Sequence, residues 1–152
     1  MDDTRDILHR VLSDILEKMA FLFAEDLDQP PDDLGAAPLW HAAIEFKGAV
    51  SGRIETAAPE PLCLTLAANA MGVEPDMLEG LTPKDALGEF LNIVCGEFIE
   101  MRQGNQQIYH LAIPVLSEFA PDQWRALAAR PETVSLLVED QPMLARAEVR
   151  EN

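Results

Sequence analysis

The spacing of the apolar residues changes along the chain, and this change constrains the fold more than any other feature. Over residues 4–23 the apolar residues recur at helical spacing, which predicts an amphipathic helix. A loop rich in Pro and Asp follows at residues 28–38. Over residues 40–57 the apolar residues alternate, and Gly48 and Gly52 bracket a tight connection, which predicts two antiparallel strands joined as a hairpin.

Two further helices carry start and stop signals. The second opens with Pro59 and Pro61 and ends at Gly72, because proline suits the first helical turn and glycine suits the position after the last one. The third helix, over residues 83–103, has the most complete set of signals. These are the N-cap Thr82, Pro83 at the first helical position, Asp85 in a capping box, and Gly104 after the last turn.

The rest of the chain predicts strands. Residues 108–116, 133–138 and 143–149 form apolar segments, of which the last two are joined by a turn at residues 139–142. Residues 121–129 are typical of a short helical turn. The order of these elements favours an α+β fold, in which long helices pack on a largely antiparallel sheet. Since no linker interrupts the pattern, we expect residues 1–152 to form a single domain.

The charge balance narrows the range of partners. The chain has 11 basic and 27 acidic residues, a net charge of −16, and no cluster of Lys or Arg. Such a chain repels phosphate groups, which argues against binding to nucleic acids or anionic membranes. The sequence has no apolar stretch long enough to span a bilayer, and its acidic start is unlike a signal peptide, so we expect a cytoplasmic protein. Cys63 and Cys95 lie in apolar segments and predict buried, reduced thiols.

The third predicted helix has two distinct faces. The apolar side chains that we expect to pack on the sheet are Leu87, Leu91, Val94, Phe98 and Met101. The opposite face carries Asp85, Glu89, Asn92, Gly96, Glu100 and Gln103. Glycine within a helix costs roughly 1 kcal/mol relative to alanine, so Gly88 and Gly96 need a reason, either close packing or room for a partner. Taken alone, a Glu-x-x-Asn pair is common on solvated helix faces.

Three segments together resemble the CheC/CheX chemotaxis phosphatases. The segment DALGEFLNIVCG at residues 85–96 is similar to the D-x-x-x-E-x-x-N-x-x-x-G signature of that family. Upstream, FKGAVSG at residues 46–52 is similar to the family's F-x-G-x-x-x-G hairpin. Residues 61–72 are similar to its following helix, which closes in a turn with Met and Gly. The resemblance covers residues 44–114 in the family's order and spacing.

The resemblance implies a phosphatase that hydrolyses the aspartyl phosphate of a CheY-like response-regulator receiver domain. It assigns Glu89 to docking on a receiver lysine and Asn92 to positioning the attacking water. Asp85 would support the motif by stabilising the start of the helix. Gly96 would support it by leaving clearance for the partner. Because phosphoryl transfer depends mainly on positioning and electrostatics, a neutral carboxamide can suffice. The resemblance also implies that the chain needs no cofactor of its own, since the receiver would supply a divalent metal such as Mg²⁺.

The second copy of the motif, which CheC-like members carry on the first helix, is altered here. The corresponding residues 13–20 keep Glu17 but have Ala20 where asparagine belongs, and alanine cannot orient a water. We therefore expect one site per chain, as in CheX-like members, which tend to form dimers. The apolar terminal strands at residues 133–149 also predict a homodimer, because an unpaired outer strand can pair with a second copy.

Two other classes of function are compatible with the sequence. A non-catalytic module could bind a receiver, or assemble like the related flagellar switch components. Asn92 favours the enzyme, because a binding module has no need of a water-orienting amide. A small-molecule binding domain is also possible, although the sequence has no pocket signal.

The other polar and aromatic residues point to structural roles. The histidines are scattered without ligand spacing or an adjacent nucleophile, which predicts structural or surface roles for His9, His41 and His110. We expect packing roles for Trp40 and Trp124.

Overall fold

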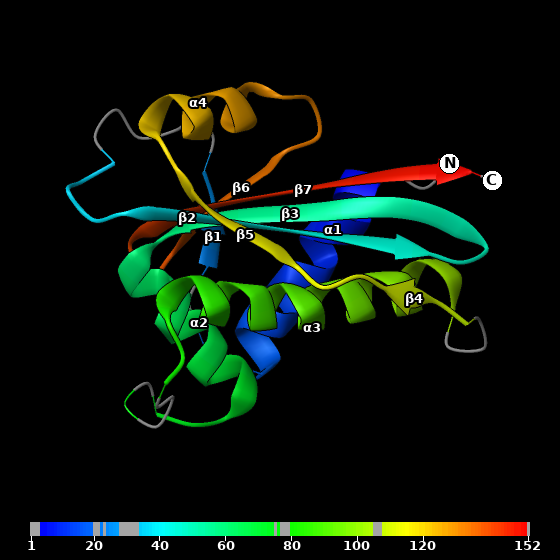
Figure 1. Ribbon diagram of the computed structural model, residues 1–152, viewed down its shortest axis with the longest axis horizontal. Coiled ribbons are helices and arrows are strands. Elements are labelled where there is room, and N and C mark those ends of the chain that lie inside the picture. Colours follow the sequence, from blue (N-terminus) through cyan, green and yellow to red (C-terminus); the bar gives the residue numbers. More distant parts are fainter. Residues whose placement is uncertain are drawn as a thin grey trace.

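The chain folds around one antiparallel sheet, which Figure 1 shows between two layers of helices. The computed structural model describes residues 4–19, 22, 24–27, 34–74, 76, 80–104 and 108–151. The helices are α1 (Thr4–Asp14), which continues as a π-helical turn (Ile15–Met19), α2 (Glu60–Met71), α3 (Pro83–Gln103) and α4 (Pro121–Ala129). The strands are β1 (Ala24–Asp26), β2 (Leu39–Lys47), β3 (Val50–Pro59), β4 (His110–Leu111), β5 (Val115–Phe119), β6 (Val134–Val138) and β7 (Gln141–Glu151).

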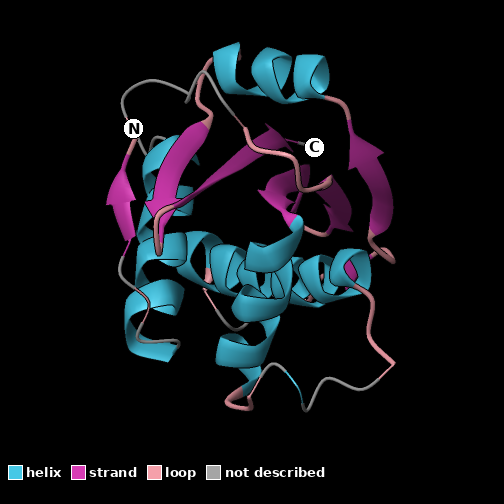
Figure 2. Cartoon of the chain, turned by 90° about the vertical axis from the view of Figure 1, so that its left-hand side faces the viewer, coloured by secondary structure: helices cyan, strands magenta, loops and turns pink. Residues whose placement is uncertain are grey.

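The sheet has the strand order β1-β6-β7-β3-β2-β4, and β5 pairs with β2 on the same side as β4. All of these pairings are antiparallel. Helices α1, α2 and α3 cover one face, and α4 covers part of the other, which we call the outer face (Figures 1 and 2). This architecture confirms the predicted α+β fold with a largely antiparallel sheet.

The predicted hairpin is confirmed as β2 and β3, which pair along their whole lengths. Its turn is formed by Gly48 and Ala49. Gly52, predicted to bracket the turn, lies inside β3 and opposite Phe46. A side chain is excluded at this position because a Cβ would overlap the Phe46 ring and the Glu148 carbonyl oxygen of the neighbouring β7. The Gly52 position therefore reflects packing between strands and not turn geometry.

The predicted helix signals are also confirmed. The Thr82 hydroxyl oxygen accepts a hydrogen bond from the Asp85 backbone N–H at 3.2 Å, and the hydroxyl donates to the Asp85 carboxylate at 2.7 Å. Pro83 is the first residue of α3. Gly72 and Gly104 follow the last residues of α2 and α3 with φ of 74° and 84°, a region that glycine adopts without steric cost.

Some predicted boundaries are wrong. The first helix is regular only to Asp14, and the strand β1, too short to show a period, was missed. The strand predicted at residues 108–116 is instead β4 and β5, separated around Pro114, which has no backbone N–H to donate to a sheet. Of the predicted loop, residues 28–33 lie outside the described residues, and residues 34–38 form neither helix nor strand.

The terminal hairpin of β6 and β7 is confirmed, but its predicted place at the edge of the sheet is wrong. Its turn is made by Glu139 and Asp140, whose φ angles of 49° and 67° suit a two-residue hairpin. β6 lies between β1 and β7, while β7 lies between β6 and β3. Both strands therefore have two neighbours. The edges of the described sheet are β1 on one side and β4 with β5 on the other.

Two apolar cores join the layers. The larger lies between the sheet and helices α1 to α3, and includes Phe46, Ile54 and Phe98. The smaller lies under α4, where the fully buried Trp124 packs with Leu39. The predicted packing role of Trp124 is therefore confirmed.

Both cysteines are buried and free, as predicted. Burial raises the pKa of the Cys63 and Cys95 thiols to about 12, so both stay protonated at neutral pH. Among the described residues, the helices are all too short or too polar to cross a membrane.

Candidate functional site

Helix α3 lies with one face on the sheet and the other toward solvent. Leu87, Leu91, Val94 and Phe98 are buried as predicted, but Met101 is 41% exposed, so its predicted place in the core is wrong. Figure 1 shows that the last turns of α3 extend beyond α2, so the described helix has less cover at this end.

The polar face of α3 carries the motif residues in one row. Asp85, Glu89, Asn92 and Gly96 are three or four residues apart, which places them on the same side of a helix. Glu89 is exposed and Asn92 is partly exposed. Among the described residues, neither side chain has a hydrogen bond or an ion pair. We call this row the Glu89–Asn92 ridge. The polar groups of the Glu89 and Asn92 side chains are available to a partner.

Asp85 lies in the same row but is already engaged. Its carboxylate accepts from the Thr82 hydroxyl, and its backbone N–H donates to the same oxygen. A negative charge in the first turn also complements the partial positive charge of a helix N-terminus. Asp85 therefore stabilises the start of α3, one turn before Glu89.

The two glycines inside α3 have different surroundings. A Cβ on Gly88 would lie 3.0 Å from Leu116 Cδ2 and 3.7 Å from Pro114 Cβ, so close packing of the β5 segment explains this glycine. A Cβ on Gly96 would have no atom within 4 Å. Gly96 is also exposed. It therefore leaves the helix surface open one turn beyond Asn92.

The exposed face of α3 is acidic. Glu89, Glu97 and Glu100 are all exposed on this one helix. Carboxylates this close together create a negative potential, which favours a cationic group on any partner that approaches the ridge. Glu89 is the member of this set that lies next to the Asn92 carboxamide.

The altered copy of the motif falls where α1 ends. Glu17 lies in the π-helical turn and is exposed, while Ala20 lies outside the described residues. Glu17 has no asparagine three residues later, so the described chain has one Glu-x-x-Asn ridge, on α3.

The sequence interpretation missed a second polar cluster, on the outer face of the sheet. His41 Nε2 lies 2.9 Å from Glu55 Oε1, and Arg53 donates to Glu55 Oε2 at 2.6 Å. The period of two along a strand could have indicated the cluster, because His41 faces the same way as Arg53 and Glu55 once the hairpin register is known.

The other two histidines fit surface roles: His9 pairs with Asp26 at 2.6 Å, and His110 is exposed.

Metal ligands are not grouped in the described part of the chain. No three or more His, Cys, Asp or Glu side chains come together there in a way that could hold an ion.

The sequence of this chain matches the model of one known protein family. The sequence profile described as chemotaxis phosphatase CheX matches residues 41–119, a range that includes the whole of α3 and the ridge. Among curated proteins, none matches the sequence.

Solved structures share the fold over nearly the whole chain. The chemotaxis protein CheX from Vibrio vulnificus has a TM-score of 0.61 at 17% identity, covering 98% of this chain and 100% of that chain. CheX from Desulfovibrio desulfuricans has a TM-score of 0.60 at 12% identity, covering 97% and 99%. A CheX–CheY–BeF₃–Mg²⁺ complex from Borrelia burgdorferi gives 0.58 at 15% identity, covering 98% and 99%. At these identities the likeness concerns the fold.

Proposed function

This chain belongs to the CheX family of chemotaxis phosphatases, and on that premise we propose that it hydrolyses the aspartyl phosphate of a CheY-like receiver domain. The observation that carries the proposal is the Glu89–Asn92 ridge, which is unpartnered among the described residues and open at Gly96. The fold match to the V. vulnificus protein spans 98% of this chain, which supports treating residues 1–152 as one phosphatase domain.

Glu89 is the docking residue in this proposal. Its carboxylate is exposed on an acidic helix, so it attracts a lysine of the receiver. Asn92 follows three residues later, about 4.5 Å further along the helix axis. An ion pair at Glu89 would therefore bring the Asn92 carboxamide over the neighbouring phosphoryl group.

Asn92 is the water-positioning residue. A carboxamide offers both a donor and an acceptor, so Asn92 can accept from the attacking water and donate to a second oxygen at once. The water attacks phosphorus in line with the aspartyl oxygen, the bond from phosphorus to that oxygen breaks, and inorganic phosphate leaves. Holding the water in this geometry supplies the positioning on which phosphoryl transfer depends.

The divalent metal would belong to the receiver, which leaves the phosphatase chain to supply position and charge. The relative from B. burgdorferi forms a complex that contains CheY, BeF₃ and Mg²⁺, and BeF₃⁻ is a chemical analogue of a phosphoryl group. A ridge with one carboxylate and one carboxamide would complete such a site. This relative supports a CheY-like receiver as the partner class.

We also propose that the protein is a homodimer, with a different edge from the one suggested by the sequence. β5 pairs with β2 and forms an outer edge of the described sheet. The exposed apolar side chains Ile108 (79%) and Leu111 (41%) lie just before it. Such an edge offers free backbone groups and apolar surface to a second copy.

The decay of phosphorylated receiver tests the enzymatic proposal. Receivers encoded in the same genome are phosphorylated, and the rate of phosphate loss is measured with and without the protein. We expect the protein to accelerate this decay for its cognate receiver. Binding of a BeF₃⁻-treated receiver without any acceleration would instead identify a non-catalytic binding module.

A further inference from the structure

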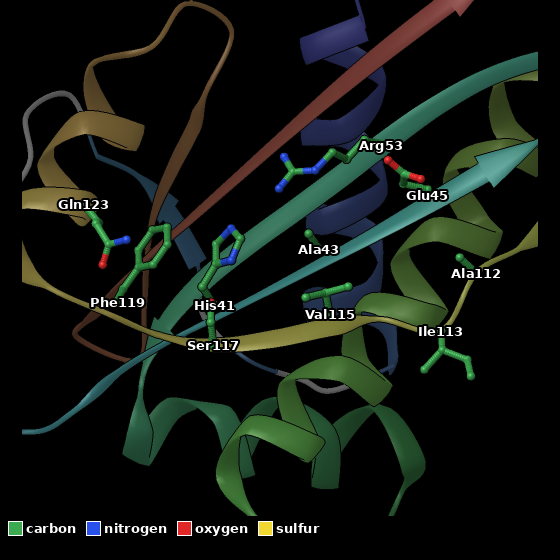
Figure 3. A pocket seen from close by; sticks show the side chains of 10 residues that line it. All are labelled: His41, Ala43, Glu45, Arg53, Ala112, Ile113, Val115, Ser117, Phe119 and Gln123. Carbon is green, nitrogen blue, oxygen red and sulfur yellow. The ribbon is translucent and has the colours of Figure 1, made fainter.

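A pocket of about 440 Å³ opens on the outer face of the sheet, away from the Glu89–Asn92 ridge. Figure 3 shows Phe119, His41 and Gln123 at one end of the pocket and Glu45 and Arg53 at the other. Its volume falls in the range of known small-molecule sites.

The floor of the pocket is a fixed polar assembly. His41 is only 7% exposed, and its ring stacks on Phe119 with centroids 4.2 Å apart and planes 8° apart. Oε2 of the buried Glu55 carboxylate accepts a hydrogen bond from Arg53 at 2.6 Å. Its Oε1 lies 2.9 Å from His41 Nε2. Glu55 therefore orients both of these side chains, which gives the pocket a preorganised lining.

The pocket also contains the exposed carboxylate of Glu45. Glu45 and Arg53 are directly opposite in the β2–β3 register, yet Arg53 turns to Glu55. Among the described residues, Glu45 has no side-chain hydrogen bond or ion pair. Side chains opposite each other on paired strands start about 5 Å apart. Glu45 and Arg53 can therefore reach two oppositely charged groups that are carried by one small molecule.

The wall of the pocket is apolar and open to solvent. Ile113 is 88% exposed and Val115 is 69% exposed, and both line the pocket together with Ala43. Binding of a ligand over apolar surface of this kind is favourable, because it removes that surface from water. The pocket thus joins two charged groups at one end to an apolar wall that leads toward Phe119.

We propose that this pocket binds a zwitterionic small molecule, namely a free α-amino acid with an apolar side chain. Its ammonium group pairs with Glu45, its carboxylate accepts from the remaining N–H groups of Arg53, and its side chain lies against Ile113 and Val115. A purely anionic ligand would meet Glu45 and a chain of net charge −16, whereas a zwitterion is neutral. This inference does not depend on the phosphatase proposal.

The pocket wall also contacts α3. Ile113 and Val115 line the pocket, while the intervening Pro114 and the following Leu116 lie against Gly88 of α3. A ligand in the pocket would therefore lie across this segment from Gly88. Gly88 is one helical turn before Asn92, so the amide of Gly88 is a suitable probe of whether binding in the pocket is felt on α3.

Calorimetric titration of the full chain with the free L-amino acids tests the proposal. We expect an apolar amino acid to bind, and its N-acetylated and amidated forms to lose binding, because each lacks one of the two charges. Glu45→Gln should weaken binding of the amino acid about tenfold, the effect of losing one charge-assisted hydrogen bond. Val115→Trp should abolish it by filling the pocket, whereas Met71→Trp, at an exposed apolar residue at the end of α2 that does not line the pocket, should leave it unchanged.

Amide chemical shifts locate the site independently of affinity. We expect the titration to move the signals of Val115 and Gly88, and to leave that of Gly72, at the end of α2, unmoved. The proposal is overturned if no amino acid binds at millimolar concentration, or if Val115→Trp leaves binding intact. It is also overturned if the wild type is a dimer that binds no amino acid and Val115→Trp makes it monomeric, since the face is then an interface between copies.

Discussion

Glu89 and Asn92 lie three residues apart on one helix face. A substitution of Glu89 removes a negative charge, whereas a substitution of Asn92 removes a neutral carboxamide. Glu89 has a charge that acts over several ångströms, whereas the Asn92 carboxamide acts at hydrogen-bond distance. Both are unpartnered among the described residues, so replacing either should leave the fold intact. The chemistry at the ridge can therefore be separated residue by residue.

Asn92→Ala should lower the dephosphorylation of a cognate receiver by roughly 10²–10³-fold, the scale seen when one preorganised polar group is removed from an active site. Docking should survive, because Glu89 is untouched. The measurements are the decay of phosphorylated receiver and the affinity for a BeF₃⁻-treated receiver. Equal losses of affinity and of rate would assign Asn92 to binding alone.

Glu89→Ala should weaken both receiver binding and turnover, because it deletes the charge that meets the receiver lysine. The wild-type interaction should also fade with added salt, since ions screen charges at exposed sites. Affinity measured over a salt series checks this expectation. Glu17→Ala is the matched control, because Glu17 is exposed on the altered copy and should change neither quantity. A salt-independent affinity would contradict the docking role.

Among the elements, α3 positions the Glu89–Asn92 ridge, and the β2–β3 hairpin positions the polar cluster on the outer face. α3 packs through Leu87, Leu91 and Phe98, and the segment leading into β5 packs across Gly88. The hairpin carries the larger core on one face and the buried cluster of His41 and Glu55 on the other. The stability of these two elements is therefore open to direct tests.

The two glycines of α3 should respond to substitution in opposite ways. Gly96→Ala should raise the free energy of unfolding by up to about 1 kcal/mol, because alanine favours a helix and nothing lies within 4 Å of the new Cβ. Gly88→Leu should lower it by about 1–3 kcal/mol, because the larger side chain meets Leu116 and Pro114. Urea denaturation of both variants measures the difference. Equal effects would show that the β5 segment does not pack on α3 in solution.

Glu55 should make the stability of the hairpin depend on pH. Burial alone would raise the pKa of Glu55, but the hydrogen bond with His41 and the positive charge of Arg53 outweigh it and hold the pKa below the ordinary 4.5. A carboxyl with a lowered folded pKa stabilises the fold above its unfolded pKa, and this contribution is lost as the pH falls through the folded pKa.

Glu55→Gln should therefore lower Tm at neutral pH, and the difference from the wild type should shrink as the pH falls below the ordinary 4.5. Thermal unfolding at a series of pH values gives this comparison. Glu118→Gln, at an exposed position on β5, is the control and should alter Tm little at any pH. A Tm difference that stays constant down to acidic pH would contradict a charged Glu55 in the folded protein.

At the scale of the whole molecule, the sheet has two different edges. β1 ends it on one side, and β4 with β5 ends it on the other. Exposed apolar side chains lie on the approach to the second edge and in β4, at Ile108 and Leu111. This edge is the one where a second copy could extend the sheet.

Light scattering at tens of micromolar protein should give the mass of a dimer. The double variant Ile108→Lys with Leu111→Lys should give a monomer, because charges on an edge oppose strand pairing between copies. Met71→Lys, at an exposed apolar residue outside this edge, should stay dimeric. A monomeric wild type at the same concentration would rule out the homodimer.

Features that depend on local interactions could be predicted from the sequence. The caps of α3 at Thr82 and Gly104, the turn of the β2–β3 hairpin and the helical spacing from Asp85 to Gly96 all depend on residues close together in the sequence. They were predicted correctly for that reason. The other features depend on contacts between segments that are distant in the sequence, and these contacts form only in the folded chain. Residues 133–149 are interior because β1 and β3 flank them, and Met101 is exposed because α3 extends beyond α2. Gly88 is packed because the segment before β5 crosses it, and the outer pocket exists because β2, β3 and β5 bring its residues to one face.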